Sequence, residues 1–101
     1  MTQVNDIVDF DPTWYSTATE DERKTFREWM LGVLDMHEKV TVTFRKADGE
    51  MRTMNCTTKE GVRPVVENKK LSDTLCTVWD TDLNAWRSFK FENITAINFE
   101  L

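Results

Sequence analysis

The chain has 101 residues, of which 40% are apolar and 31% charged, with three glycines, two prolines and a net charge of −5. The low glycine and proline content excludes collagen-like and linker-type chains, and the 11% of aromatic residues excludes wholesale disorder, so we expect one globular domain. A domain of this size buries only about two thirds of its unfolded surface, which leaves little material for a deep catalytic cleft and disfavours an enzyme.

The first segment, residues 1–18, is predicted to form an acidic arm. Residues 1–22 carry six acidic side chains and no basic one. A purely solvated tail would not need Trp14 and Tyr15, so we expect the arm either to dock on its own domain or to contact a partner. The acidic charge could imitate a phosphate backbone toward a basic partner, or it could simply keep the chain soluble.

Residues 19–101 are predicted to form the folded domain, which begins with an amphipathic helix. Thr19 and Glu22 match a capping box, and acidic residues occupy the positive end of the helix dipole. Apolar side chains then recur at helical spacing, at Phe26, Trp29, Met30, Val33 and Leu34. This periodicity predicts a helix over about residues 20–36 with its apolar stripe facing the core. His37, the only histidine, lies at the end of this helix, where we expect a structural role.

After residue 39 the period changes from helical to alternating. Residues 40–45 alternate apolar and polar side chains, as in a half-buried strand, and an Asp-Gly turn at 48–49 leads to a partner strand over 51–57. Residues 58–73 have few large apolar groups and are predicted to form a long loop, a feature that is often functional in small domains. The basic residues of this loop are Lys59, Arg63, Lys69 and Lys70.

A second hairpin follows the loop. Its strands are predicted over residues 75–79 and 85–91, joined by a turn at 80–84. Residues 92–93 break the second of these strands, and 94–99 supply a last short one. Five short antiparallel strands remove their exposed edges best by closing into a small barrel. We therefore predict an α+β fold in which the arm and one amphipathic helix pack on a five-stranded antiparallel barrel.

Two strings in the second hairpin carry a family resemblance. The sequence VWD at residues 78–80 and WRSF at 86–89, together with the strand at 40–44, resembles a family of small bacteriophage proteins with an SH3-like β-barrel fold. The resemblance covers roughly residues 26–98. It implies an SH3-like barrel and a viral protein that acts inside the host cell. The run RSFKFENI at 87–94 is also similar to the closing strands of WYL domains, Sm-like barrels that sense ligands. This chain lacks a Trp-Tyr-Leu run, so ligand sensing is not carried over.

Arg87 is the most informative charged residue of the second hairpin. Strand alternation places it on the core-facing side near one end of the barrel, where its guanidinium needs an acceptor. An ion pair with Asp80 or Asp82 across the turn would hold the hairpin together, whereas an unpaired Arg87 would be free to read a ligand. Both interpretations are open from the sequence.

The same alternation places Trp86 and Lys90 on the outward face of the hairpin. If Trp79 is accessible beside them, these residues form an aromatic, cationic surface suited to stacking a base or anchoring a protein. If the helix covers that face, they belong to the core. The full set of candidate partner-binding residues is Trp14, Tyr15, Trp79, Trp86, Arg87, Lys90, Lys69 and Lys70.

No pattern in the sequence points to catalysis, a cofactor or a metal. Cys56 and Cys76 lie twenty residues apart with neither a CxxC pair nor clustered histidines, so we expect both to be small core residues. The chain start lacks a basic, apolar signal segment, and no apolar run is long enough to cross a membrane. We therefore expect an intracellular, reducing location in the host cytoplasm and no membrane partner.

The sequence thus predicts a binding module without catalytic, cofactor or metal residues. Our first hypothesis is a phage accessory protein that modulates a host or viral protein by occupying its surface. The alternative is a nucleic-acid-binding or nucleotide-binding barrel that uses Trp86, Arg87 and Lys90 with the basic loop. A further alternative is a self-assembling structural component, and the oligomeric state stays open.

Overall fold

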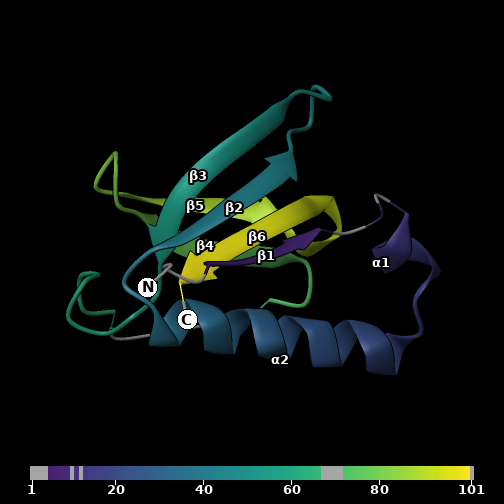
Figure 1. The fold of residues 1–101 in the computed structure, drawn as a ribbon, viewed down its shortest axis with the longest axis horizontal. Helices are drawn as coiled ribbons and strands as arrows, with labels where there is room; N and C mark the ends of the chain where they lie inside the picture. Colours follow the sequence, from purple (N-terminus) through teal and green to yellow (C-terminus); the bar gives the residue numbers. More distant parts are fainter. Residues whose placement is uncertain (1–4, 10, 12, 67–71, 101) are drawn as a thin grey trace.

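The structure is a computed structural model that describes residues 5–9, 11, 13–66 and 72–100. In chain order the elements are β1 (Asn5–Asp9), α1 (Trp14–Thr17), α2 (Glu20–Met36), β2 (Val40–Arg45), β3 (Met51–Thr57), β4 (Leu75–Asp80), β5 (Ala85–Lys90), the 3-10 turn η1 (Phe91–Asn93) and β6 (Ile94–Glu100). Figure 1 shows a bent sheet with α2 lying along one side of it. The predicted α+β architecture, with one long helix and two hairpins, is confirmed.

All described strands belong to one antiparallel sheet with the order β1-β6-β2-β3-β4-β5. The two predicted hairpins are the β2–β3 and β4–β5 pairs, and η1 turns the chain from β5 into β6, which returns to pair with β2. Within the described residues, no ladder joins β5 to β1 or β6. The barrel is therefore open between β1 and β5, the two end strands of the sheet. The sequence had predicted a closed barrel.

The arm supplies a sixth strand that the sequence did not predict. β1 pairs with β6 over five residue pairs, from Asn5↔Glu100 to Asp9↔Ala96. Its sequence, NDIVD, is short and carries two acidic residues, so it has a weak intrinsic strand signal. The strand forms because its backbone pairs with the otherwise free edge of β6. Of the two expected alternatives for this segment, docking on its own domain is the one observed.

The described part of the arm that follows β1 also packs on α2. The rings of Trp14 and Tyr15 meet Phe26 at centroid distances of 5.3 and 6.0 Å. The Tyr15 hydroxyl accepts a hydrogen bond of 2.9 Å from the buried guanidinium of Arg27, which also donates to Glu20 at 3.0 Å. Both arm aromatics are therefore half-buried anchors.

α2 has the predicted bounds, and both of its ends are satisfied by specific partners. At the first turn, the Thr19 backbone N–H donates to the Glu22 carboxylate and the Glu22 backbone N–H donates to the Thr19 hydroxyl, which completes the capping box. At the last turn, the Thr57 hydroxyl at the end of β3 donates to the carbonyls of Leu34 and His37. These bonds fix α2 against the sheet.

The core lies between α2 and the sheet. Trp29, predicted for the core-facing stripe, lies at its margin, where it is 39% exposed and contacts Phe99. Cys56 and Cys76 are buried core residues, as predicted, and burial raises the pKa of the Cys56 thiol. The buried apolar residues are Phe26, Met30, Val33, Leu34, Val40, Val42, Phe44, Met54, Cys56, Cys76, Val78, Phe89, Phe91, Ile94, Ile97 and Phe99.

Candidate functional site

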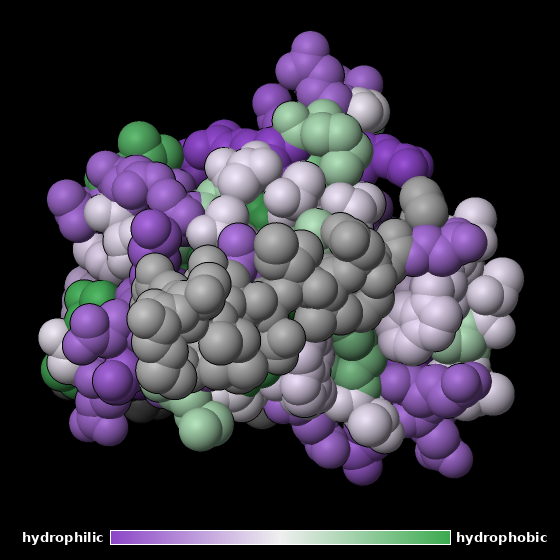
Figure 2. All heavy atoms as spheres, in the orientation of Figure 1, coloured by the Kyte–Doolittle hydropathy of each residue, from purple (hydrophilic) through white to green (hydrophobic). Residues whose placement is uncertain are grey.

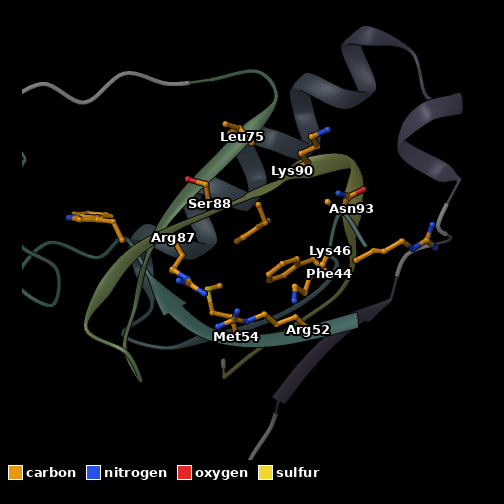
Figure 3. Close-up of a pocket in the computed structure, with 13 residues that line it drawn as sticks. Phe44, Lys46, Arg52, Met54, Leu75, Arg87, Ser88, Lys90 and Asn93 are labelled. Carbon is orange, nitrogen blue, oxygen red and sulfur yellow. The ribbon is translucent and has the colours of Figure 1, made fainter. Parts of the chain in front are cut away.

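A groove opens where the two hairpins diverge. The ladder between β3 and β4 consists of Cys56↔Asp80 and Thr57↔Trp79, at one end of β3. Away from this junction, the end of the β2–β3 hairpin and strand β5 enclose a groove of about 530 Å³. Figure 3 shows this space with side chains from both hairpins entering it.

The floor of the groove is apolar. Phe44 from β2 and Phe89 from β5 stack with their ring centroids 5.0 Å apart and their planes 18° apart, and Met54 from β3 lies beside them in the lining. The two rings are only 7% and 4% exposed, so they close the floor and offer little ring surface to a ligand.

The rim of the groove is cationic. Its charged lining residues are all basic: Arg45, Lys46, Arg52, Arg87 and Lys90. Lys46 and Lys90 have acidic neighbours outside the lining, Asp48 at 3.8 Å and Glu92 at 3.9 Å. In the described part of the chain, no ion pair involves Arg52 or Arg87. Figure 3 shows Arg87 reaching into the groove toward Met54, whereas Ser88 and Lys90 turn away from its centre.

The outer face of the β4–β5 hairpin is aromatic. Trp79 and Trp86 are cross-strand partners with their centroids 5.4 Å apart in an edge-to-face arrangement. Trp86 is 37% exposed, and the neighbouring pair Thr77 and Ser88 shares a hydrogen bond of 3.0 Å. The predicted alternation along β5 is thus confirmed. Trp86 is accessible, so α2 does not cover this face and Trp86 does not belong to the core.

The ion pair proposed for Arg87 is not formed. Asp80 is buried and accepts hydrogen bonds from the backbone N–H groups of Asp82 and Leu83, which shapes the turn. Asp82 accepts a bond from the Asn55 side chain across the sheet. Both carboxylates therefore have other donors, and no ion pair within the described residues joins either of them to Arg87. The ion-pair interpretation of Arg87 is therefore not met within the described residues, and ligand reading by Arg87 stays a prediction.

The structure does not bring all candidate residues together. Arg87, Lys90 and Trp86 are among the residues that line the groove, and Trp86 also pairs with Trp79 on the outer face of the same hairpin. Trp14 and Tyr15 lie against α2 and are not among the residues that line the groove. Lys69 and Lys70 lie outside the described residues.

The sequence did not single out Arg45, Lys46 and Arg52, the groove cations of the first hairpin. One signal was present for Arg52, because strand alternation places it on the same face as the core residues Met54 and Cys56. A basic residue on the core-facing side of a strand near a barrel end was the feature that singled out Arg87. For Lys46, which follows β2 in the turn, the sequence offered no comparable signal.

Other candidate chemistries can be assessed within the described residues. No group of three or more His, Cys, Asp and Glu side chains is arranged to hold a metal ion there. Over the same residues, no helix combines the length and apolar character needed to span a membrane. A ring nitrogen of His37 lies 2.8 Å from the Val33 carbonyl, and its ring packs on Phe99, as befits the structural role predicted for it.

Comparisons with known proteins agree with this fold. A family model described as WYL_2, Sm-like SH3 beta-barrel fold, matches residues 33–95, a range that includes every groove residue from Phe44 to Asn93. A protein of Enterobacteria phage T4, named as an uncharacterized 11.5 kDa protein in the Gp31-cd intergenic region, is 29% identical over 87 residues, which cover 79% of this chain and 84% of that protein. No solved structure matches the chain. The resemblance to small phage proteins with an SH3-like barrel is thereby confirmed.

Proposed function

We propose, from the premise that this chain belongs to the WYL_2 family of Sm-like SH3 β-barrels, that it is a non-catalytic binding protein whose basic groove takes nucleic acid. The observation that carries the proposal is the charge of the groove, whose charged lining residues are all basic. This choice favours the second of the functions considered from the sequence. We propose the host cytoplasm as its place of action, since the relative is encoded by a phage.

The groove has the chemistry that phosphate recognition needs. Arg52 and Arg87 come from different hairpins and line one space together with Lys46, so their charges can act on one ligand. Guanidinium groups bind phosphate oxygens through paired hydrogen bonds, and here no carboxylate of the described residues neutralises the two arginines. The net charge of −5 opposes indiscriminate binding, so contact is confined to this local patch.

A salt titration tests this function. We expect a labelled single-stranded oligonucleotide to bind with an affinity that falls as salt rises, with a logarithmic slope of about −2 for three phosphate contacts. The double variant Arg52→Ala/Arg87→Ala should weaken binding at least tenfold and flatten the slope, because, of Lys46, Arg52 and Arg87, it leaves only Lys46. Fluorescence anisotropy measures both quantities.

A matched control separates local from general electrostatics. Lys24→Ala/Lys39→Ala removes the same charge from exposed positions outside the groove and should leave the affinity within about twofold of the wild type. Equal losses in both double variants would contradict a groove site. A flat salt response of the wild-type protein would contradict nucleic-acid binding altogether.

The exposed ring of Trp86, packed against the half-buried Trp79, supports a second candidate function, the modulation of a host or viral protein by occupying its surface. Exposed Trp side chains at the centre of a surface are common anchors of protein interfaces. On the face shown in Figure 2, apolar surface outside the grey atoms is broken into separate patches among hydrophilic side chains. A protein partner that binds the Trp79–Trp86 pair should lose its binding on Trp86→Ala, without any dependence on the groove arginines.

A further inference from the structure

We infer that the nucleic acid is single-stranded and crosses the free edge of β5, with phosphates in the groove and a base stacked on Trp86. This inference rests on the function proposed above. It adds the chemical class of the ligand and a second contact surface, because the two faces of the β4–β5 hairpin then act on one strand.

The two contacts come from consecutive residues on opposite faces of β5. Arg87 pairs across the ladder with the buried residue Val78, on the side of the sheet that faces the groove. Trp86 pairs with Trp79 on the other side. A ligand that touches both Arg87 and Trp86 must therefore pass around the strand and not through the sheet.

The position of β5 allows this path. β5 is the last strand in the sheet order, and within the described residues its ladder partner is β4 alone. Its outer edge therefore presents backbone N–H and C=O groups that can bond to base edges. An extended strand of nucleotides can cross this edge from the groove to the outer face.

The floor of the groove provides no stacking surface. Phe44 and Phe89 stack on each other and are almost fully buried, so a base gains little by entering. Trp86 is the exposed ring nearest in sequence to Arg87, and Trp79 holds it edge-to-face from the adjacent strand. Lys90 has the same orientation along β5 as Trp86 and also lines the groove, so it offers a further cation to the backbone of the ligand.

This arrangement favours a single strand over other polyanions. In a duplex the bases are paired and stacked inside, so none is available to a side chain, whereas the bases of a single strand stack readily on aromatic rings. A free nucleotide joins one base to its phosphate at short range and cannot reach both faces of β5. A polyphosphate has no base and would use only the groove.

The test measures the affinity of oligothymidine, of a duplex of equal length and of inorganic polyphosphate for the full chain. Trp86→Ala should weaken oligothymidine binding about tenfold, the loss of one stacked base, while its salt slope and the polyphosphate affinity stay unchanged. Trp86→Phe should restore most of the loss, since it keeps a ring. Arg52→Ala/Arg87→Ala should weaken both single-stranded and polyphosphate ligands. The wild type should bind the duplex more weakly than oligothymidine.

The outcomes separate this inference from the function on which it rests. If Trp86→Ala binds oligothymidine as well as the wild type does, or if the duplex binds as tightly as the single strand, the inference is overturned while groove binding stands. If neither oligothymidine nor polyphosphate shows salt-dependent binding to the wild type, the proposed function itself is overturned. Thermal unfolding establishes that the variants are folded, and Trp86→Leu replaces Trp86→Ala if the latter is not.

Discussion

At the scale of single residues, Thr57 shows how one hydroxyl joins two elements. Its side chain is fully buried and donates to the carbonyls of Leu34 and His37 at the end of α2. The last carbonyls of a helix have no partners within the helix, and burial removes water as a substitute. Thr57 therefore completes the helix terminus from a strand that lies twenty-three residues further along the chain than Leu34.

Replacing this hydroxyl should destabilise the protein without changing its shape. Thr57→Val keeps the volume but takes the hydroxyl away from the His37 carbonyl, whereas the Leu34 carbonyl keeps its bond from the Thr58 backbone N–H. We expect this loss to lower the free energy of unfolding by about 1–3 kcal/mol. Urea unfolding measures this change. Thr77→Val is the control, because its hydroxyl bond to Ser88 is exposed, and it should cost less than about 0.5 kcal/mol. Equal costs would show that burial does not set the energy of the bond.

At the scale of elements, the first turn of α2 contains a capping interaction whose strength depends on pH. The pKa of the Glu22 carboxyl is lowered below its ordinary value of 4.5. The main cause is its hydrogen bond with the Thr19 backbone N–H, and the second is its hydrogen bond with the Thr19 hydroxyl. A carboxyl whose pKa is lowered by folding stabilises the folded state when it is ionised. Its contribution is therefore complete above pH 4.5 and is lost as the pH falls through the folded-state pKa.

This linkage predicts how Glu22→Gln behaves. The amide still accepts hydrogen bonds but does not ionise, so the variant should be less stable than the wild type at neutral pH. The difference in thermal unfolding midpoint should shrink as the pH falls below 4.5, because the wild-type carboxyl then becomes protonated. Circular dichroism across this range measures it. A difference that is constant with pH would contradict a role for the charge.

At the scale of the whole molecule, the stacked rings of Phe44 and Phe89 hold the two hairpins together where they diverge. Residue pairs join β3 and β4 at one end of β3, so contacts between side chains must hold the other end. The same rings form the groove floor. Folding of the barrel and positioning of the groove arginines thus depend on one contact.

Removal of this contact should affect stability and binding together. Phe89→Ala should lower the free energy of unfolding by about 3–5 kcal/mol, since it deletes a buried ring and leaves a cavity. The mild variant Phe89→Leu should cost less and should weaken oligonucleotide binding, because Arg87 then loses its fixed position. Urea unfolding and anisotropy measure the two effects. Ser88→Ala, an exposed change in the same strand, should alter stability by about 0.5 kcal/mol or less.

The charge distribution also belongs to the whole molecule. The acidic residues of the first 22 positions and the basic middle segment were visible in the sequence, but their arrangement in space was not. Folding places cations from the two hairpins around one groove, while part of the acidic arm docks at the opposite edge of the sheet as β1. A protein of net negative charge thereby gains a local site for an anion.

The sequence by itself determined the features that depend on neighbours along the chain. The capping box and the 3.6-residue period define α2, and alternation with turn residues defines both hairpins and the opposite faces of Trp86 and Arg87. Only the tertiary structure decided the pairing of β1 with β6, the meeting of Arg52 with Arg87, and the use of Asp80 in its own turn instead of in an ion pair. Local periodicity sets the direction of a side chain, whereas its partner depends on how distant segments pack, and a strand as short and acidic as β1 forms only when a free edge is present to bind it.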